Sequence, residues 1–162
     1  MHIEAFKNRR LSARYTCVYL DATFISLRRD TVSKEACYIV CGIKEDGTKE
    51  ILAYAIAPTE SATIWKEVLL DIKSRGAEDV LLFVSDGLKG IQDVIFQVYP
   101  QTAYQSCLIH ITRNIAHKVR VSDRGAVCKD FKNIYQAKTE EDGLKALQKF
   151  VEKGEKSYPK IT

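Results

Sequence analysis

The sequence lacks a hydrophobic run of about 18 residues, the length that a membrane-spanning helix needs, so we expect no membrane segment. The first residues, Met1 to Lys7, contain no apolar signal core, which favours a cytoplasmic protein. The sequence also lacks the Cys-x-x-Cys motif, since none of its five cysteines has that spacing to another. An odd number of unpaired cysteines argues against a disulfide framework and indicates free thiols in a reducing compartment.

Length and charge bound the organisation of the chain. Its 162 residues suit one domain with a sizeable core and a small appendage. Residues 1–106 carry 13 Lys and Arg against 14 Asp and Glu, whereas residues 107–162 carry 12 against 7. A basic segment after a near-neutral core suggests a polyanionic partner, although charged helices are usually only solvated.

The run from Thr16 to Ile25 predicts a buried strand with a carboxylate near its centre. Nine of its ten residues are apolar, aromatic or β-branched, and the tenth is Asp21. Burying an ionised Asp is costly unless the carboxylate is paired, hydrated or bound to a metal. Asp21 is therefore either a residue at a frayed strand end or a metal-binding carboxylate on a rigid scaffold.

The rest of the hydrophobic pattern predicts an α/β protein with a sheet of mixed direction. A basic, extended lead-in (1–15) precedes a core (16–106), and a helical segment (107–162) follows. Strands are expected at 16–27, 36–43, 51–57, 80–84 and 102–105, with a polar turn at 28–34, an Asp46-Gly47 hairpin, and helices at 61–75 and 87–98. The first three strands form an antiparallel meander, and the apolar fourth strand suits a parallel, central position. Breaks near Ser122 and Lys138-Thr139 divide the helical segment.

A second carboxylate, Asp86, ends the fourth predicted strand in the run Val84-Ser85-Asp86-Gly87. Asp before a helix is a common N-cap, which explains Asp86 without any chemistry. If the first and fourth strands are neighbours, however, Asp21 and Asp86 reach one point at the edge of the sheet. Two carboxylates with open coordination suit Mg²⁺ or Mn²⁺ rather than Zn²⁺.

Cys107 and His110 form a third feature, because helical spacing places them on one face. Zinc is an alternative partner for this pair, but no second pair of ligands completes a four-ligand site. Plain packing of the two side chains is another, since free cysteine is mostly buried.

Three blocks of the chain resemble signature blocks of Mutator-type transposases, which occur in bacterial insertion sequences and plant Mutator elements. They are Tyr19–Thr23, Val84–Gly90 and Cys107–Asn114, in the family's order. The likeness runs from about Phe6 to the C-terminus and includes Gly42–Gly47 and Ile64–Leu69.

The resemblance implies an RNase H-like catalytic domain whose Asp-Asp-Glu triad binds two divalent metal ions, Mg²⁺ or Mn²⁺. Asp21 matches the first triad residue, Asp86 the second, and Cys107 with His110 the family's Cys-x-x-His motif; all four are candidate catalytic residues. In this family the Glu follows a long helical insertion, and residues 107–162 match the start of that insertion. We therefore expect that this chain does not catalyse strand transfer by itself.

The resemblance also implies a DNA partner, namely transposon ends and target DNA, and no membrane. Six basic residues are predicted to bind DNA: Lys7, Arg9, Arg10, Arg14, Lys89 and Arg113. A full-length protein of this kind is expected to act as a homo-oligomer in the bacterial cytoplasm, on the nucleoid.

Two further functions stay open beside a transposase catalytic fragment. One is an inactive, truncated transposase that binds DNA or the full-length enzyme and interferes with it. The other is a different RNase H-like nuclease, such as a ribonuclease or a resolvase, against which the Cys-x-x-His block argues.

Overall fold

The computed structural model describes residues 2–28 and 32–158, and the chain divides into two compact units. The first unit comprises residues 1–107 and holds the sheet, and the second comprises residues 108–162 and is helical. Each unit is considered by itself below. The predicted division into an arm, a core and a helical segment stays a prediction about domains.

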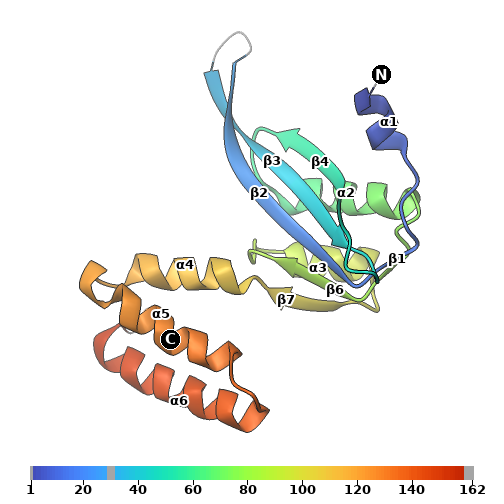
Figure 1. The fold of residues 1–162 in the computed structure, drawn as a ribbon. Coiled ribbons are helices and arrows are strands. Elements are labelled where there is room, and N and C mark those ends of the chain that lie inside the picture. The colour runs from blue at the N-terminus through green and yellow to red at the C-terminus, as the bar shows by residue number, and fades with distance from the viewer. Residues whose placement is uncertain (1, 29–31, 159–162) are drawn as a thin grey trace. The chain divides into compact units, whose positions relative to one another are not determined.

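The first unit is built on a five-stranded mixed sheet in the order β4-β3-β2-β6-β7 (Figure 1). Its strands are β2 (Cys17–Arg28), β3 (Val32–Ile43), β4 (Lys49–Ala57), β6 (Leu82–Ser85) and β7 (Ala103–Ser106). The first three pair antiparallel, and the last two join β2 in parallel. This meander with added parallel strands confirms the predicted RNase H-like α/β class.

Two helices, α2 (Ala62–Ser74) and α3 (Ile91–Val98), pack on one face of this sheet (Figure 1). Side chains alternate along a strand, so Val18 and Leu20 of β2 are buried on that face while Tyr19 and Asp21 are exposed on the other. The core contains the fully buried side chains Tyr38, Val40, Trp65, Leu69, Ile72, Phe83 and Ile95. One face of the sheet thus packs against the core, and Asp21 lies on the opposite face.

Turn chemistry explains how the predicted connections form. The Asp46-Gly47 turn joins β3 to β4, with Gly47 at a φ of 83°. Helix α2 begins after Ser61, whose hydroxyl accepts a hydrogen bond from the Ile64 N–H (3.3 Å), and Gly76 follows its end at a φ of 113°. Of the polar turn predicted at 28–34, residues 29–31 lie outside the described residues, and Ser33 and Lys34 belong to β3.

The N-terminal segment is not the extended lead-in that the sequence suggested. It contains helix α1 (His2–Asn8) and a short strand, β1 (Arg14–Tyr15). The Phe6 ring lies 5.8 Å from the Tyr54 ring, and Leu11 and Tyr15 are buried in the core. These few apolar residues are enough to pack the segment onto the first unit.

The predicted fourth strand at 80–84 is two strands in the structure. Residues Asp79–Val80 form β5, which pairs in parallel with β1, and β6 begins at Leu82. The chain passes from one sheet to the other at Leu81. Its N–H donates to the Tyr15 carbonyl (3.1 Å), and its carbonyl accepts from the Ala103 N–H (2.9 Å). The expected helix at 87–98 also starts later, at Ile91, because Gly87 and Gly90 adopt positive φ values of 86° and 84°.

The second unit consists of α4 (Leu108–Lys118), a 3₁₀ turn (Val121–Asp123), α5 (Arg124–Tyr135) and α6 (Glu140–Ser157). The breaks fall near Ser122 and Lys138-Thr139, as predicted, and the Thr139 hydroxyl caps α6 by accepting from the Asp142 N–H (3.1 Å). Among the described residues, no helix has the length and apolar character needed to cross a membrane.

Candidate metal centre

Asp21 and Asp86 each follow the last paired residue of two adjacent parallel strands, β2 and β6. Strand β6 pairs with β2 through Leu20 and Ser85, and each Asp directly follows its paired residue. Asp21 is exposed because, like Tyr19, it lies on the face of the sheet opposite the core. The premise that Asp21 lies in a fully buried strand is therefore wrong. The register places the two Asp residues at neighbouring backbone positions, and the closeness of their carboxylates stays a prediction.

Asp86 does not cap the helix that follows it. Helix α3 starts five residues later, at Ile91, and has no side-chain cap. Asp86 instead accepts a hydrogen bond from the Leu88 N–H (Oδ1, 3.2 Å), which fixes its carboxylate inside the turn. The preceding Ser85 is buried and its hydroxyl contacts the Tyr104 hydroxyl (3.0 Å). A rigid turn thus carries Asp86, and the capping explanation does not apply.

A third carboxylate, Glu60, lies near this pair and was not singled out from the sequence. It precedes the N-cap of α2, and its Oε1 accepts a hydrogen bond from Trp65 Nε1 (3.2 Å). Burial raises the pKa of Glu60, the Trp65 hydrogen bond lowers it, and the charges of Asp86 and Asp21 raise it further, so that the pKa lies above its usual value. No spacing rule marks a Glu at this position, so only the fold reveals it.

The carboxylate oxygens of this site are the type of ligand that a hard divalent cation prefers. Asp21 and Asp86 are the residues that could hold Mg²⁺ or Mn²⁺, since both ions favour carboxylate oxygens. Within residues 2–28 and 32–158, no three Asp, Glu, His or Cys side chains are already arranged as a metal site. The donor set therefore fits such an ion in chemistry, with two ligands from the predicted pair.

Cys107 and His110 fall on either side of the division between the two units. The Cys107 N–H donates to the Ser85 carbonyl (2.6 Å), one residue before Asp86. The Cys107 thiol also helps Cys17 to raise the pKa of the Tyr19 phenol, which places it near the strand that carries Asp21. His110 is half-buried in the first turn of α4. Their joint catalytic role stays a prediction.

Three of the six predicted DNA-binding residues make contacts inside the first unit. Arg9 forms an ion pair with Glu50 (Nη1–Oε2, 2.9 Å), Arg14 pairs with Asp79 (Nε–Oδ2, 3.0 Å), and Lys7 Nζ lies 5.5 Å from the Tyr54 ring centre. Arg9 is half-buried, and the other five residues are exposed. Binding of DNA by any of the six stays a prediction.

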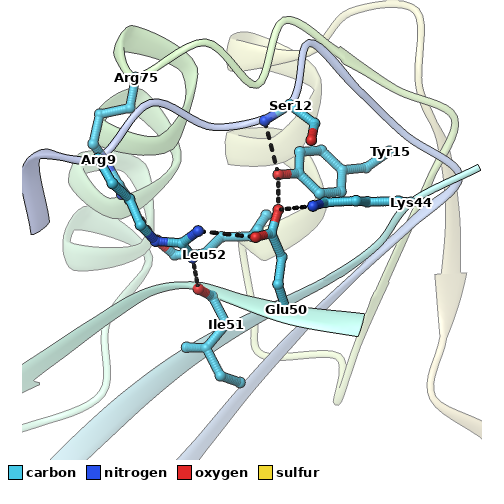
Figure 2. A network of polar contacts seen from close by, with 8 residues as sticks. All are labelled: Arg9, Ser12, Tyr15, Lys44, Glu50, Ile51, Leu52 and Arg75. Atoms are coloured by element: carbon cyan, nitrogen blue, oxygen red, sulfur yellow. Dashed lines mark hydrogen bonds and ion pairs between the residues drawn. The ribbon is translucent and has the colours of Figure 1, made fainter. Parts of the chain in front are cut away.

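Glu50 is the centre of a polar network that holds the N-terminal segment (Figure 2). Arg9 and the Tyr15 hydroxyl both donate to its carboxylate, and Lys44 Nζ lies 3.6 Å from Oε1. Burial acts to raise the pKa of Glu50, but the hydrogen bonds from Arg9 and Tyr15 and the charge of Lys44 lower it below its usual value. Burial and the hydrogen bond to Glu50 raise the pKa of Tyr15. This network gives Arg9 a structural role.

Comparison with known proteins gives a consistent result. A family model described as "Transposase, Mutator family" matches residues 1–162. The chain is 47% identical over 156 residues to the transposase for insertion sequence element IS1201 of Lactobacillus helveticus, covering 96% of this chain and 42% of that protein. It is 41% identical over 160 residues to the transposase for insertion sequence element IS905 of Lactococcus lactis, covering 99% and 41%.

The chain thus spans about two fifths of the length of these curated relatives. Among solved structures, it is similar to the HTLV-2 integrase catalytic core domain in complex with magnesium, with a TM-score of 0.42 and 12% identity. That match covers 82% of this chain and 83% of the other.

Proposed function

The chain belongs to the Mutator family of transposases, and we propose from this that it supplies the metal-binding part of an enzyme that cuts and joins DNA strands. One observation carries the proposal: Asp21 and Asp86 follow paired residues of two adjacent parallel strands. Carboxylates at such a strand end can share one cation, which in-line displacement at phosphorus requires.

The residues of the chain have distinct tasks in this proposal. A bound Mg²⁺ or Mn²⁺ would activate the attacking hydroxyl and neutralise the leaving oxygen. Asp21 would hold the ion from a strand whose position is fixed by β3 and β6. Asp86 would hold it from a turn that the Leu88 N–H and the Ser85–Tyr104 contact keep in place. Because the strand and the turn are fixed by the fold, little reorganisation of the backbone would be needed to bind the ion.

We propose that DNA contacts the exposed basic residues Arg10, Lys89 and Arg113, together with the basic second unit. Residues 108–162 carry 12 Lys and Arg against 7 Asp and Glu, so this unit attracts a polyanion irrespective of sequence. Transposon ends and target DNA are the proposed substrates, with the full-length protein acting as a homo-oligomer on the bacterial nucleoid.

Cys107 and His110 are proposed to act beside the metal centre in the full-length protein. The bond from the Cys107 N–H to the Ser85 carbonyl supports this, because it ties the start of the motif to the strand end that carries Asp86. His110→Ala should leave the helical signal of the second unit unchanged and abolish cleavage. Unfolding of α4 in that variant would favour the packing explanation instead.

Plasmid cleavage with Mn²⁺ tests the proposal, measured on a protein of the relatives' full length that contains this chain. Asp21→Asn and Asp86→Asn should each reduce nicking by about 10²-fold or more, because a lost ligand removes stabilisation where charge develops. Asp93→Asn is the matched control, since Asp93 is an exposed carboxylate in the first turn of α3. Equal nicking by all three variants would contradict the proposal. DNA binding without any cleavage would favour the interfering, inactive protein.

A further inference from the structure

Hydrogen bonds to Tyr38 of β3 hold the turn between β4 and α2, which carries Glu60, in a fixed position. The Tyr38 hydroxyl bonds to both neighbours of Glu60: it donates to the Thr59 carbonyl (2.8 Å) and accepts from the Ser61 N–H (2.7 Å). Tyr38 is fully buried and pairs with Ala22, the residue after Asp21. The backbone around Glu60 is therefore anchored to the core side of the sheet next to Ala22, one residue along β2 from Asp21.

The side chain of Glu60 is held as well as its backbone. Trp65 Nε1 donates to Oε1 at 3.2 Å, and the indole packs edge-on against the Tyr38 ring, with 4.8 Å between ring centres. Trp65 is 2% exposed, so it has little freedom to move away. A carboxylate fixed by a buried tryptophan has a defined place, unlike a mobile surface Glu.

The turn that carries Asp86 lies near the start of α2. Gly90, at the end of the Asp86 turn, is close enough to Ala62 that a Cβ at position 90 would lie 3.6 Å from the Ala62 Cβ, and Ala62 is two residues after Glu60. The end of the Asp86 turn and the residues that follow Glu60 are therefore neighbours. In agreement, burial and then the charges of Asp86 and Asp21 raise the pKa of Glu60.

We propose that Glu60 is a positioning residue of the metal centre, whose charge strengthens the binding of a divalent cation by Asp21 and Asp86. The inference rests on the function proposed above and extends it to a residue outside the three blocks that carry the family resemblance. Glu60 acts through its charge, and Asp21 and Asp86 remain the proposed ligands of the ion. Three like charges in one place repel one another, and a divalent cation removes that repulsion.

Trp65 provides a direct readout, because it is the only tryptophan of the chain and bonds to Glu60. The experiment titrates the chain with Mn²⁺ and follows both the quenching of Trp65 fluorescence and the free Mn²⁺ signal in electron paramagnetic resonance. Glu60→Gln keeps an oxygen that can accept from Trp65 and removes only the charge. It should weaken Mn²⁺ binding about five- to tenfold at low salt, as expected for one nearby charge.

Glu67→Gln is the matched control, because Glu67 is an exposed carboxylate on α2, the helix that follows Glu60, and its removal changes the net charge equally. It should leave the Mn²⁺ affinity within about twofold of the wild type, since exposed charges are screened. The difference between the wild type and Glu60→Gln should shrink as salt is added, which a merely structural effect would not do. Thermal unfolding of Glu60→Gln verifies that the variant is folded.

The outcomes separate this inference from the function on which it rests. Loss of Mn²⁺ binding in Asp21→Asn with unchanged binding in Glu60→Gln overturns the role of Glu60 and leaves the metal centre in place. Unchanged binding in Asp21→Asn and Asp86→Asn overturns the metal centre itself. Equal weakening by Glu60→Gln and Glu67→Gln shows a net-charge effect only and also overturns the inference.

Discussion

The two units of the chain bury their hydrophobic side chains to very different extents. In the first unit, large side chains such as Tyr15, Tyr38 and Phe83 are fully buried in one continuous core. In the second, the buried hydrophobic side chains among the described residues are Ile115, Val119 and Phe150. A helical unit with so few buried side chains has a small free energy of unfolding. The sheet unit buries more apolar surface and can therefore keep its side chains in fixed positions. A metal centre that needs fixed carboxylates belongs on the first kind of scaffold.

Charge separates the units in the same way. The first unit is nearly neutral, and basic residues such as Arg9 and Arg14 bond to its own carboxylates. The second unit has five more basic than acidic residues, since residues 108–162 carry 12 against 7. We propose that the well-packed unit carries the chemistry and that the basic unit attracts DNA. Each prediction below tests one side of this division.

The largest expected effect comes from the core of the first unit. Phe83→Ala should reduce the free energy of unfolding by about 3–5 kcal/mol, because it leaves a cavity in a closely packed core. Urea unfolding followed by Trp65 fluorescence measures this value. Phe24→Ala on β2 is the control, since Phe24 is 59% exposed and should change stability by less than about 0.5 kcal/mol. Similar losses in both variants would contradict a core centred on Phe83.

A smaller and more local effect is expected in the second unit. Phe150→Ala should cost about 2–3 kcal/mol, because Phe150 contacts Phe131 (5.9 Å between ring centres) and is one of few buried residues there. Hydrogen exchange should become faster in α5 and α6 and stay unchanged in β2 and β3. Leu144→Ala on the same helix, with Leu144 58% exposed, should change neither. Faster exchange throughout the sheet would mean that the two units unfold as one.

The sequence predicts those helices, strands and turns that are stabilised by residues close to one another in the chain. The meander of β2, β3 and β4, the Ser61 cap and the breaks in the helical segment all follow from periodicity and turn residues. The failures involve distant partners. Helix α1 packs on Tyr54, and Leu81 divides a strand because it bonds to the Tyr15 carbonyl. Neither partner can be identified from the local pattern.

The same distinction holds at the candidate site. Asp21 and Asp86 were identifiable because each interrupts or ends an apolar run, where a carboxylate is unexpected. Glu60 stands before a helix in a polar turn, where a Glu is ordinary, so its position beside Asp21 and Asp86 depends on the folded β4–α2 turn. The exposure of Asp21 is also not evident from the sequence, because it depends on which face of the sheet the helices cover.

A third prediction concerns the Glu50 network that fixes the N-terminal segment. Glu50→Gln should cost about 1–2 kcal/mol at neutral pH, because charge-assisted hydrogen bonds from Arg9 and Tyr15 are lost. The pKa of Glu50 is lowered in the folded state, so its stabilisation is present above the unfolded pKa of about 4.3 and is lost as the pH falls through the lower folded pKa. Urea unfolding at a series of pH values should therefore show the variant approaching the wild type in acid.

Glu45→Gln is the control for that series, because the Glu45 side chain is 65% exposed. It should change stability by less than about 0.5 kcal/mol at every pH. A loss in Glu50→Gln that stayed constant into acid would mean that packing, and not the charge of Glu50, stabilises the segment.

The smallest expected effect concerns DNA and tests the charge comparison directly. Arg113 is exposed in the basic second unit, whereas Arg9 is bound to Glu50 in the first. Arg113→Gln should weaken sequence-independent DNA binding by about twofold and reduce the magnitude of its salt slope by about 1, as expected for one phosphate contact. Arg9→Gln removes the same charge but should leave DNA binding nearly unchanged and lower stability instead, because its partner is internal. Fluorescence anisotropy with a labelled duplex at several salt concentrations measures both variants. If Arg9→Gln weakened binding more than Arg113→Gln, DNA would contact the N-terminal segment as well as the helices, and the proposed division between a chemical unit and a DNA-attracting unit would be wrong.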